Sequence, residues 1–122
     1  MTKELLESMD DTNTDVVEEM LETIEAFDRN RFARELDLSY RGITDLPDEL
    51  FPICRRIRIL YLDSNQIISL PRDLRMLKNL NALMLGDNNL QKVPKSIVHL
   101  KRIQVLHLSD NQITDAGCAT LA

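Results

Sequence analysis

The hexapeptide Leu60-Tyr-Leu-Asp-Ser-Asn65 decides how this chain folds, because it occurs three times. It returns as Leu83-Met-Leu-Gly-Asp-Asn88 and as Leu106-His-Leu-Ser-Asp-Asn111, so consecutive copies lie 23 residues apart. In each copy leucines alternate with other residues, which predicts a short strand with one buried face, and the asparagine indicates a turn. A fixed period of this length is typical of repeat arrays, in which stacked units bury a core that one unit could not bury alone.

The rest of each unit repeats as well. Aligned on the asparagines, the units begin near Ala33, Ile57, Leu80 and Ile103. Apolar residues take the first, fourth, sixth, eleventh and fourteenth places, which in the second and third units are Ile57, Leu60, Leu62, Ile67 and Leu70, and Leu80, Leu83, Leu85, Leu90 and Val93. A proline follows the fourteenth place in three units, as Pro47, Pro71 and Pro94. The pattern predicts stacked strands joined by return segments that are apolar on their inner side.

This spacing resembles the leucine-rich repeat family, whose pattern is LxxLxLxxNxL, over about residues 33–122. The 23-residue Leu-Pro period is similar to that of intracellular scaffolds of the plant Ras-group-related and Scribble types. The resemblance implies an α/β fold: a curved solenoid with a short parallel sheet on its concave side and irregular or short helical segments on its convex side. The residues agree with it, because leucines of successive parallel strands would point into one continuous core.

The asparagines Asn65, Asn88 and Asn111 should stack as a structural ladder. An amide side chain both donates and accepts hydrogen bonds, and it can therefore satisfy backbone groups buried where each turn bends away. In the first unit, which is one residue longer than the others, Arg41 takes the ladder place. We expect the ladder to stop at that unit, since terminal repeats are often atypical.

The last unit also departs from the pattern. Residues 113–122 resemble the helical half of the ribonuclease-inhibitor type of repeat, with Asp115 placed as a helix cap. The sequence ends at Ala122 without a charged closing helix, so the C-terminal end of the core should be exposed unless a second chain covers it. We expect either a homodimer through this end or a chain shortened from a longer parent.

The leader, residues 1–32, differs from the repeats in charge. It has three basic and ten acidic residues, a net charge of −7, whereas the rest of the chain carries +2. A short helix is predicted over residues 2–9, and a longer amphipathic helix from Asp15 to about Phe27 with Thr14 as its N-cap. The apolar side of the longer helix either covers the first repeat or docks with a partner or another copy. We therefore divide the chain into an acidic helical N-terminal cap, residues 1–32, and a solenoid of about four units, residues 33–122.

The composition is that of one soluble globular domain, with 122 residues of which 43% are apolar and 29% charged. No apolar run is long enough to span a bilayer and the N-terminus lacks a signal peptide, so we expect a cytoplasmic protein. Cys54 and Cys118 lie far apart and without metal-ligand spacing, which favours two buried thiols in a reducing compartment. The net charge of −5 argues against nucleic acid as the main partner, because binding phosphates requires a concentrated basic surface.

Binding specificity in such a solenoid should lie on strand residues that point outward from the sheet. The fifth place of the units forms one column, Asp37, Tyr61, Met84 and His107, and the third place forms another, Glu35, Ile59, Ala82 and Val105. This surface is apolar in its middle and acidic along one border, which suits a protein partner with basic residues. The predicted partner-binding residues are Asp37, Tyr40, Ile59, Tyr61, Asp63, Met84, Asp87, His107 and Asp110. The alternative is an ordinary solvated sheet face.

The basic residues of the repeats fall mostly outside the strands. They are Arg55, Arg56, Arg58, Arg72, Arg75, Lys78, Lys92, Lys95, Lys101 and Arg102. Most are expected to be solvated charges on the return segments. They also offer a second surface for an acidic partner, including the acidic leader of another copy.

The sequence offers little that points to catalysis or to a cofactor. His99 lies in a return segment and His107 stands alone among the outward strand residues, without a nucleophile placed by a recognisable motif. Three glycines form no phosphate-binding loop. The aspartates that follow the strands lie one strand apart and form no cage for a divalent cation. We therefore expect no metal and no cofactor.

Two functions remain open at this point. The first is a non-enzymatic interaction module that binds a protein partner on its concave sheet; by family resemblance the partner would be a signalling or regulatory protein such as a small GTPase or a phosphatase. The alternative is a self-assembling structural protein that forms homo-oligomers through its C-terminal repeat or its acidic helix.

Overall fold

The computed structural model describes residues 14–114. The elements are α2 (Thr14–Arg29), β1 (Glu35–Asp37), α3 (Leu50–Ile53), β2 (Ile59–Tyr61), the 3-10 helix η1 (Arg72–Met76), β3 (Ala82–Met84), the 3-10 helix η2 (Lys95–His99) and β4 (Val105–His107). The first three strands are each followed by a return segment with one short helix. The helix predicted over residues 2–9, and the helix predicted at the end of the chain with Asp115 and Cys118, lie outside the described residues.

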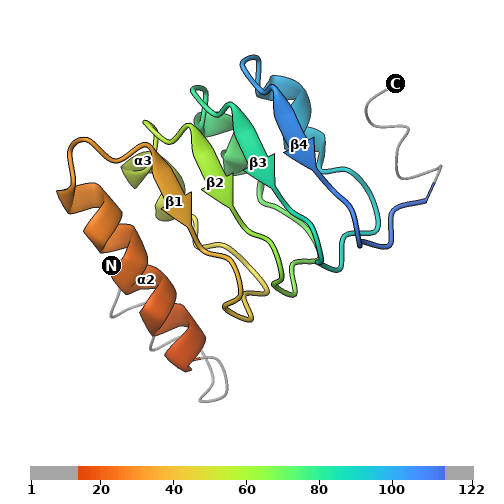
Figure 1. Ribbon diagram of the computed structural model, residues 1–122, viewed down its shortest axis with the longest axis horizontal. Helices are drawn as coiled ribbons and strands as arrows, with labels where there is room; N and C mark the ends of the chain where they lie inside the picture. The colour runs from red at the N-terminus through yellow and green to blue at the C-terminus, as the bar shows by residue number, and fades with distance from the viewer. Residues whose placement is uncertain (1–13, 115–122) are drawn as a thin grey trace.

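The four strands form one parallel sheet in the order β1-β2-β3-β4, with the return helices behind it (Figure 1). The central residues pair in register across the sheet: Leu36 with Leu60, Leu60 with Leu83, and Leu83 with Leu106. This register follows from the repeat, because equivalent residues of successive units lie side by side in neighbouring strands. The α/β solenoid with a short parallel sheet, predicted from the repeats, is therefore the fold of the described chain.

Leucine and isoleucine side chains fill the space between the sheet and the return segments. Leu60 and Leu83, the central residues of β2 and β3, are fully buried, while the residues on either side of them are half-buried and point outward. The return helices contribute the opposite wall of the core with Leu50, Leu74 and Ile97. Because every unit contributes the same places, the core continues from one unit to the next.

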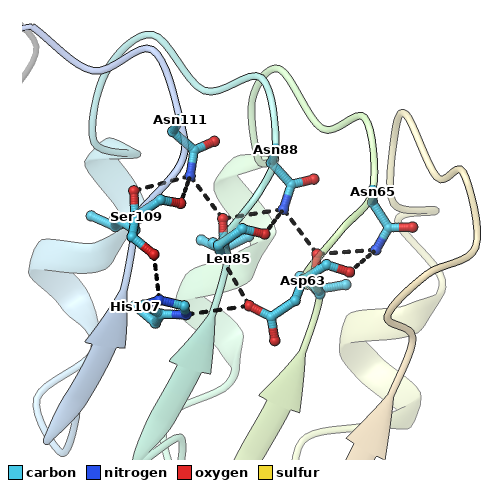
Figure 2. A network of polar contacts seen from close by, with 10 residues as sticks. Asp63, Asn65, Leu85, Asn88, His107, Ser109 and Asn111 are labelled. Atoms are coloured by element: carbon cyan, nitrogen blue, oxygen red, sulfur yellow. Dashed lines mark hydrogen bonds and ion pairs between the residues drawn. The ribbon is translucent and has the colours of Figure 1, made fainter.

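The ladder asparagines form a row just beyond the ends of the strands, as Figure 2 shows for Asn65, Asn88 and Asn111. Each amide nitrogen donates to carbonyls of its own turn and of the preceding turn; Asn88 Nδ2 lies 3.1 Å from Leu85 O and 2.9 Å from Leu62 O. Its Oδ1 accepts the N–H of Ile67 at 3.0 Å. Each asparagine therefore joins two successive turns through their backbone groups, and Asn65 and Asn88 are themselves buried.

The row of asparagines begins at Asn65. Its Oδ1 accepts the backbone N–H groups of Arg41 and Ile43, both at 3.0 Å, so Arg41 is bound by the ladder through its main chain. The Arg41 guanidinium instead donates to Asp37 O at 3.4 Å. Arginine therefore does not replace the asparagine amide in the first unit.

The residue before each ladder place has a left-handed backbone. Tyr40, Ser64, Asp87 and Asp110 have φ angles of 57°, 57°, 55° and 58°. This conformation turns the chain from the strand into the loop, and it is disfavoured for residues with a Cβ, most of all when the side chain is branched at that atom. The repeat therefore carries a small backbone strain in every described unit.

Ser64 is the position at which this strain is best tested. Ser64→Val should lower the free energy of unfolding by about 1–2 kcal/mol relative to Ser64→Gly, because only glycine adopts the left-handed region without steric cost. Urea unfolding followed by circular dichroism measures the difference. Equal unfolding midpoints for the two variants would show that the loop has relaxed to another conformation.

Helix α2 lies beside β1 at one end of the solenoid (Figure 1). Its buried side chains are Val17, Met20, Leu21, Ile24 and Phe27. Met20, Ile24 and Phe27 belong to the same core as Leu36 of β1 and Leu50 of α3. The apolar side of α2 thus covers the first unit, which is the arrangement that a cap requires, while its glutamates remain exposed.

Arg56 ties the end of α2 to the repeats. Its guanidinium donates to the carbonyl oxygens of Phe27 and Asn30, the latter at 2.7 Å, and to Ala33 O at 3.2 Å. The same group lies 4.3 Å from the centre of the Phe27 ring, at the distance of a cation–π contact. Most basic residues of the return segments were expected to be solvated, and Arg56 is an exception. A guanidinium has enough donors to satisfy several carbonyls left unpaired at a helix end.

The last described unit is less buried than the others. Leu106 and Leu108 are partly exposed, whereas the equivalent residues Leu83 and Leu85 are fully buried. Val105 of β4 is 49% exposed. The homodimer predicted through this end depends on residues 113–122, most of which lie outside the described residues.

Candidate functional site

The outer face of the sheet, defined as the face that points away from the return segments, carries two rows of side chains. The strand register places Tyr61 beside Met84 in one row, with Asp37 and His107 at its ends. Ile59 lies in the second row, beside Ala82. Ile59, Tyr61, Ala82 and Met84 are all half-buried. The middle of the outer face is therefore an apolar surface that water reaches.

A shallow hollow lies where the strands run into the ladder loops. It has a volume of about 430 Å³ and is lined by Tyr40, Asp63, Ser64, Met84, Gly86, Asp87, His107 and Asp110. It brings together six of the nine predicted partner-binding residues. Asp37, Ile59 and Tyr61 lie outside it, on the strands. The predicted residues thus divide into an apolar sheet surface and an acidic hollow that share Met84.

A polar network crosses the hollow, and Figure 2 shows its members Asp63, His107 and Ser109. Asp63 Oδ1 accepts the backbone N–H of Gly86 at 2.9 Å and lies 3.4 Å from His107 Nδ1. His107 Nε2 lies 2.5 Å from Ser109 Oγ. With the imidazole proton on Nδ1, facing the carboxylate, Nε2 accepts the Ser109 hydroxyl hydrogen. The network therefore links residues of three successive units.

This network corrects the expectation that His107 stands alone and adds to what is known of Asp63. His107 does not stand alone, because its Nδ1 contacts Asp63 and its Nε2 contacts Ser109. Asp63, also predicted to contact a partner, has its Oδ1 engaged within the protein, and its part in partner binding stays a prediction. Asp87 and Asp110 keep exposed carboxylates, and between residues 14 and 114 neither of them forms an ion pair.

Gly86 makes the network possible. A Cβ atom at this position would lie 2.6 Å from His107 Cε1 and 3.1 Å from Asp63 Oδ1, closer than ordinary van der Waals contact. This role of Gly86 was not predicted from the sequence, in which the glycines were considered for a phosphate-binding loop. The sequence feature that indicates this role is the position of Gly86 just after a strand, because a glycine there often marks the close approach of other atoms.

The order carboxylate, imidazole and hydroxyl is also that of a serine hydrolase. Such an enzyme further requires backbone donors aimed at the oxyanion and a site that excludes water. The His107 side chain is 45% exposed and Ser109 is exposed as well. The network is thus open to solvent, and we interpret it as a device that fixes the shape of the hollow.

Two further predicted residues lie at the N-terminal side of the surface. Asp37 Oδ1 accepts hydrogen bonds from Ser39 Oγ at 2.5 Å and Ser39 N at 2.9 Å, and these bonds lower the pKa of its carboxyl. Tyr40 is 80% exposed at the rim of the hollow. Asp37 therefore remains a fixed negative charge, and Tyr40 presents an aromatic ring to solvent.

Metal binding, a reactive cysteine and a membrane-spanning helix are three further possibilities for the described residues. Between residues 14 and 114, no three histidine, cysteine, aspartate or glutamate side chains gather closely enough to hold a metal ion. Burial raises the pKa of the Cys54 thiol to about 12, so this cysteine stays protonated and unreactive. None of the helices described is long and apolar enough to cross a membrane.

Comparisons with known proteins agree with this fold. A model of the leucine-rich repeat family matches residues 55–113. A leucine-rich repeat protein of Leptospira interrogans is similar in structure, with 29% identity and a TM-score of 0.60 over 69% of this chain and 27% of that one. The leucine-rich repeat domain of the type III effector XopL has 18% identity and a TM-score of 0.72 over 90% of this chain and 40% of that one. No match was found among curated protein sequences.

These likenesses support the fold rather than one subclass of repeat. The chain spans 40% or less of the length of each of the two solved chains. Neither the Ras-group-related and Scribble types nor the ribonuclease-inhibitor type is singled out by them. The family model matches just under half of the chain, and the described residues have the α/β solenoid fold that the two solved leucine-rich repeat structures share.

Proposed function

We propose that this protein is a non-enzymatic interaction module that binds a protein partner on the outer, concave face of its sheet. The observation that carries the proposal is the pair Tyr61 and Met84, adjacent in the strand register and half-buried beside an acidic hollow. Solenoid repeats present extended surfaces of this kind to their partners. Aromatic and methionine side chains are enriched at the centres of protein interfaces.

The charges of the site suggest what the partner looks like. Asp87 and Asp110 are exposed at the rim of the hollow, and Tyr40 adds an aromatic ring that a cation can approach. A partner that places an apolar side chain on Tyr61 and Met84, with lysine or arginine toward the hollow, would match both parts. Asp63 and His107 would shape the hollow rather than pair with the partner.

Two further parts of the proposal rest on the sequence. The 23-residue Leu-Pro repeat resembles that of intracellular scaffolds, which favours a cytoplasmic protein with a signalling or regulatory partner. Residues 1–32 would serve as the acidic helical cap and residues 33–122 as the solenoid. The burial of the apolar side of α2 supports this division.

The double variant Tyr61→Ala/Met84→Ala tests the binding face. Truncating two central anchors should weaken partner binding by at least about tenfold, because each such residue contributes on the order of 1–2 kcal/mol at an interface. Immobilised wild type and variant are compared for the proteins that they retain from a cell lysate. Quantitative mass spectrometry measures the ratio for each protein, and circular dichroism checks that the variant is folded.

Val98→Ala is the matched control, because Val98 is apolar and 45% exposed but lies in η2, behind the sheet. Proteins that bind the outer face should be depleted by the double variant and retained by the control. A set of specifically bound proteins that all three chains retain equally would contradict the proposal.

A further inference from the structure

A second surface lies behind the sheet, on the return segments. The residue two places before each unit is basic in three successive units: Arg55, Lys78 and Lys101, each 23 residues from the next. All three side chains are exposed. Lys78 also lines two hollows, one of about 340 Å³ with Arg55 and one of about 660 Å³ with Lys101. Because the hollows share Lys78, Met76 and Asn79, they form one basic trough across three units.

The trough has more charge than this column alone. Arg75 and Arg102 line its larger part, and the Arg102 guanidinium donates to Asn79 Oδ1 at 3.0 Å, which fixes its direction. Lys101 Nζ donates to Val98 O at 3.2 Å. Within residues 14–114, no carboxylate lies within 4.0 Å of any of these cations. The structure thus holds a preorganised set of cations without a counter-charge.

Helix α2 carries a surface of the opposite sign with a matching spacing. Glu18, Glu22 and Glu25 are exposed on the side of α2 that faces away from the solenoid. At 1.5 Å per residue they place one carboxylate about every 5 Å along the helix. Neighbouring strands of a sheet also lie about 5 Å apart, so the column Arg55, Lys78 and Lys101 has nearly the same period.

We propose that the acidic side of α2 from one copy docks into the basic trough of a second copy. The two surfaces lie on different parts of the molecule, α2 at the end of the solenoid and the trough behind the sheet. In such a contact one copy uses its helix and the other its trough, so the pair keeps one free helix and one free trough. The contact is therefore heterologous, and repeated copies form an open chain or a ring. The outer face of the sheet takes no part in it, so this proposal stands or falls independently of partner binding there.

A nucleic acid is the other class of ligand that a basic trough admits. The chain carries a net charge of −5, with ten acidic residues in the first 32, so phosphates would approach a molecule that repels them overall. A docked α2 instead uses that same acidic segment as the counter-charge. The charge distribution therefore favours a second copy over a polyanion.

Sedimentation velocity of the full chain tests the contact. In about 0.05 M salt the weight-average mass should rise with protein concentration, and in about 0.5 M salt it should return to that of the monomer, because exposed charge pairs are screened. Lys78→Glu/Lys101→Glu and Glu22→Lys/Glu25→Lys should each weaken association at least tenfold. Lys92→Glu/Lys95→Glu, which makes the same charge change outside the trough, should associate as the wild type does.

The decisive measurement is a mixture of the two charge-reversed variants. Alone, each variant places like charges in the contact and stays monomeric, whereas mixed they restore opposite charges at every junction and should associate again. The proposal is overturned if the wild type is monomeric at the highest concentration in low salt, or if the mixture fails to associate. A monomeric wild type whose trough binds a single-stranded oligonucleotide would assign the trough to a polyanion instead.

Discussion

Asn88→Ala is expected to lower the free energy of unfolding by about 3 kcal/mol or more. The change removes the acceptor of the Ile67 N–H and the donors to Leu62 O and Leu85 O. The Ile67 N–H is then left unpaired in a core where Asn88 itself is only 5% exposed. A buried polar group without a partner costs about 1–3 kcal/mol, so the N–H alone accounts for much of the loss. Asn88 joins its own turn to the preceding one, and no other side chain of the described residues accepts the Ile67 N–H.

Urea unfolding followed by far-ultraviolet circular dichroism measures this loss, with Asn89→Ala as the matched control. Asn89 is the next residue and is exposed, so the same chemical change there should shift the free energy by less than about 0.5 kcal/mol. An Asn88 variant as stable as the Asn89 variant would contradict the role of the ladder in holding the turns together.

The repeat is what makes so much of this fold predictable. Once the period is known, Leu60 and Leu83 must lie at the same height in successive turns, and both the register and the outward row of Tyr61 and Met84 follow. The spacing of the apolar residues in α2 likewise predicts which side of the helix is buried. These features depend on backbone geometry and on the alternation of side chains, which the sequence states directly.

The polar network in the hollow could not be predicted in the same way, because it depends on single side chains rather than on the repeat. Asp63 stands at the seventh place, where the next unit has Gly86 and the last has Ser109, so the sequence shows no ladder of like residues there. Only in three dimensions does the missing side chain of Gly86 let Asp63 reach His107. The contacts of Arg56 could not be predicted for a similar reason, because its partners are backbone carbonyls at the end of α2, far away in the sequence.

Ile24→Ser is expected to destabilise the protein by about 4 kcal/mol, and this change separates a cap from a helix that only docks with partners. Ile24 is 2% exposed and belongs to the core that includes Leu36 and Leu50. The substitution removes most of a buried aliphatic side chain and places a hydroxyl in the space, which combines a cavity with an unpaired polar group. Thermal unfolding by circular dichroism should show one cooperative transition at a much lower midpoint.

Ala26→Ser introduces the same side chain on the exposed side of α2 and should cost only about 0.5 kcal/mol, the difference in helix propensity. Hydrogen exchange shows which part of the Ile24→Ser variant is destabilised. The amides of β1 should lose protection together with those of α2, because both elements line the same end of the core. If only α2 lost protection while β1 and the midpoint of the repeats stayed as in the wild type, the helix would be an appendage. The first unit would then have to hold its open end by other contacts, and the acidic side of α2 would be free to dock without any cost to the fold.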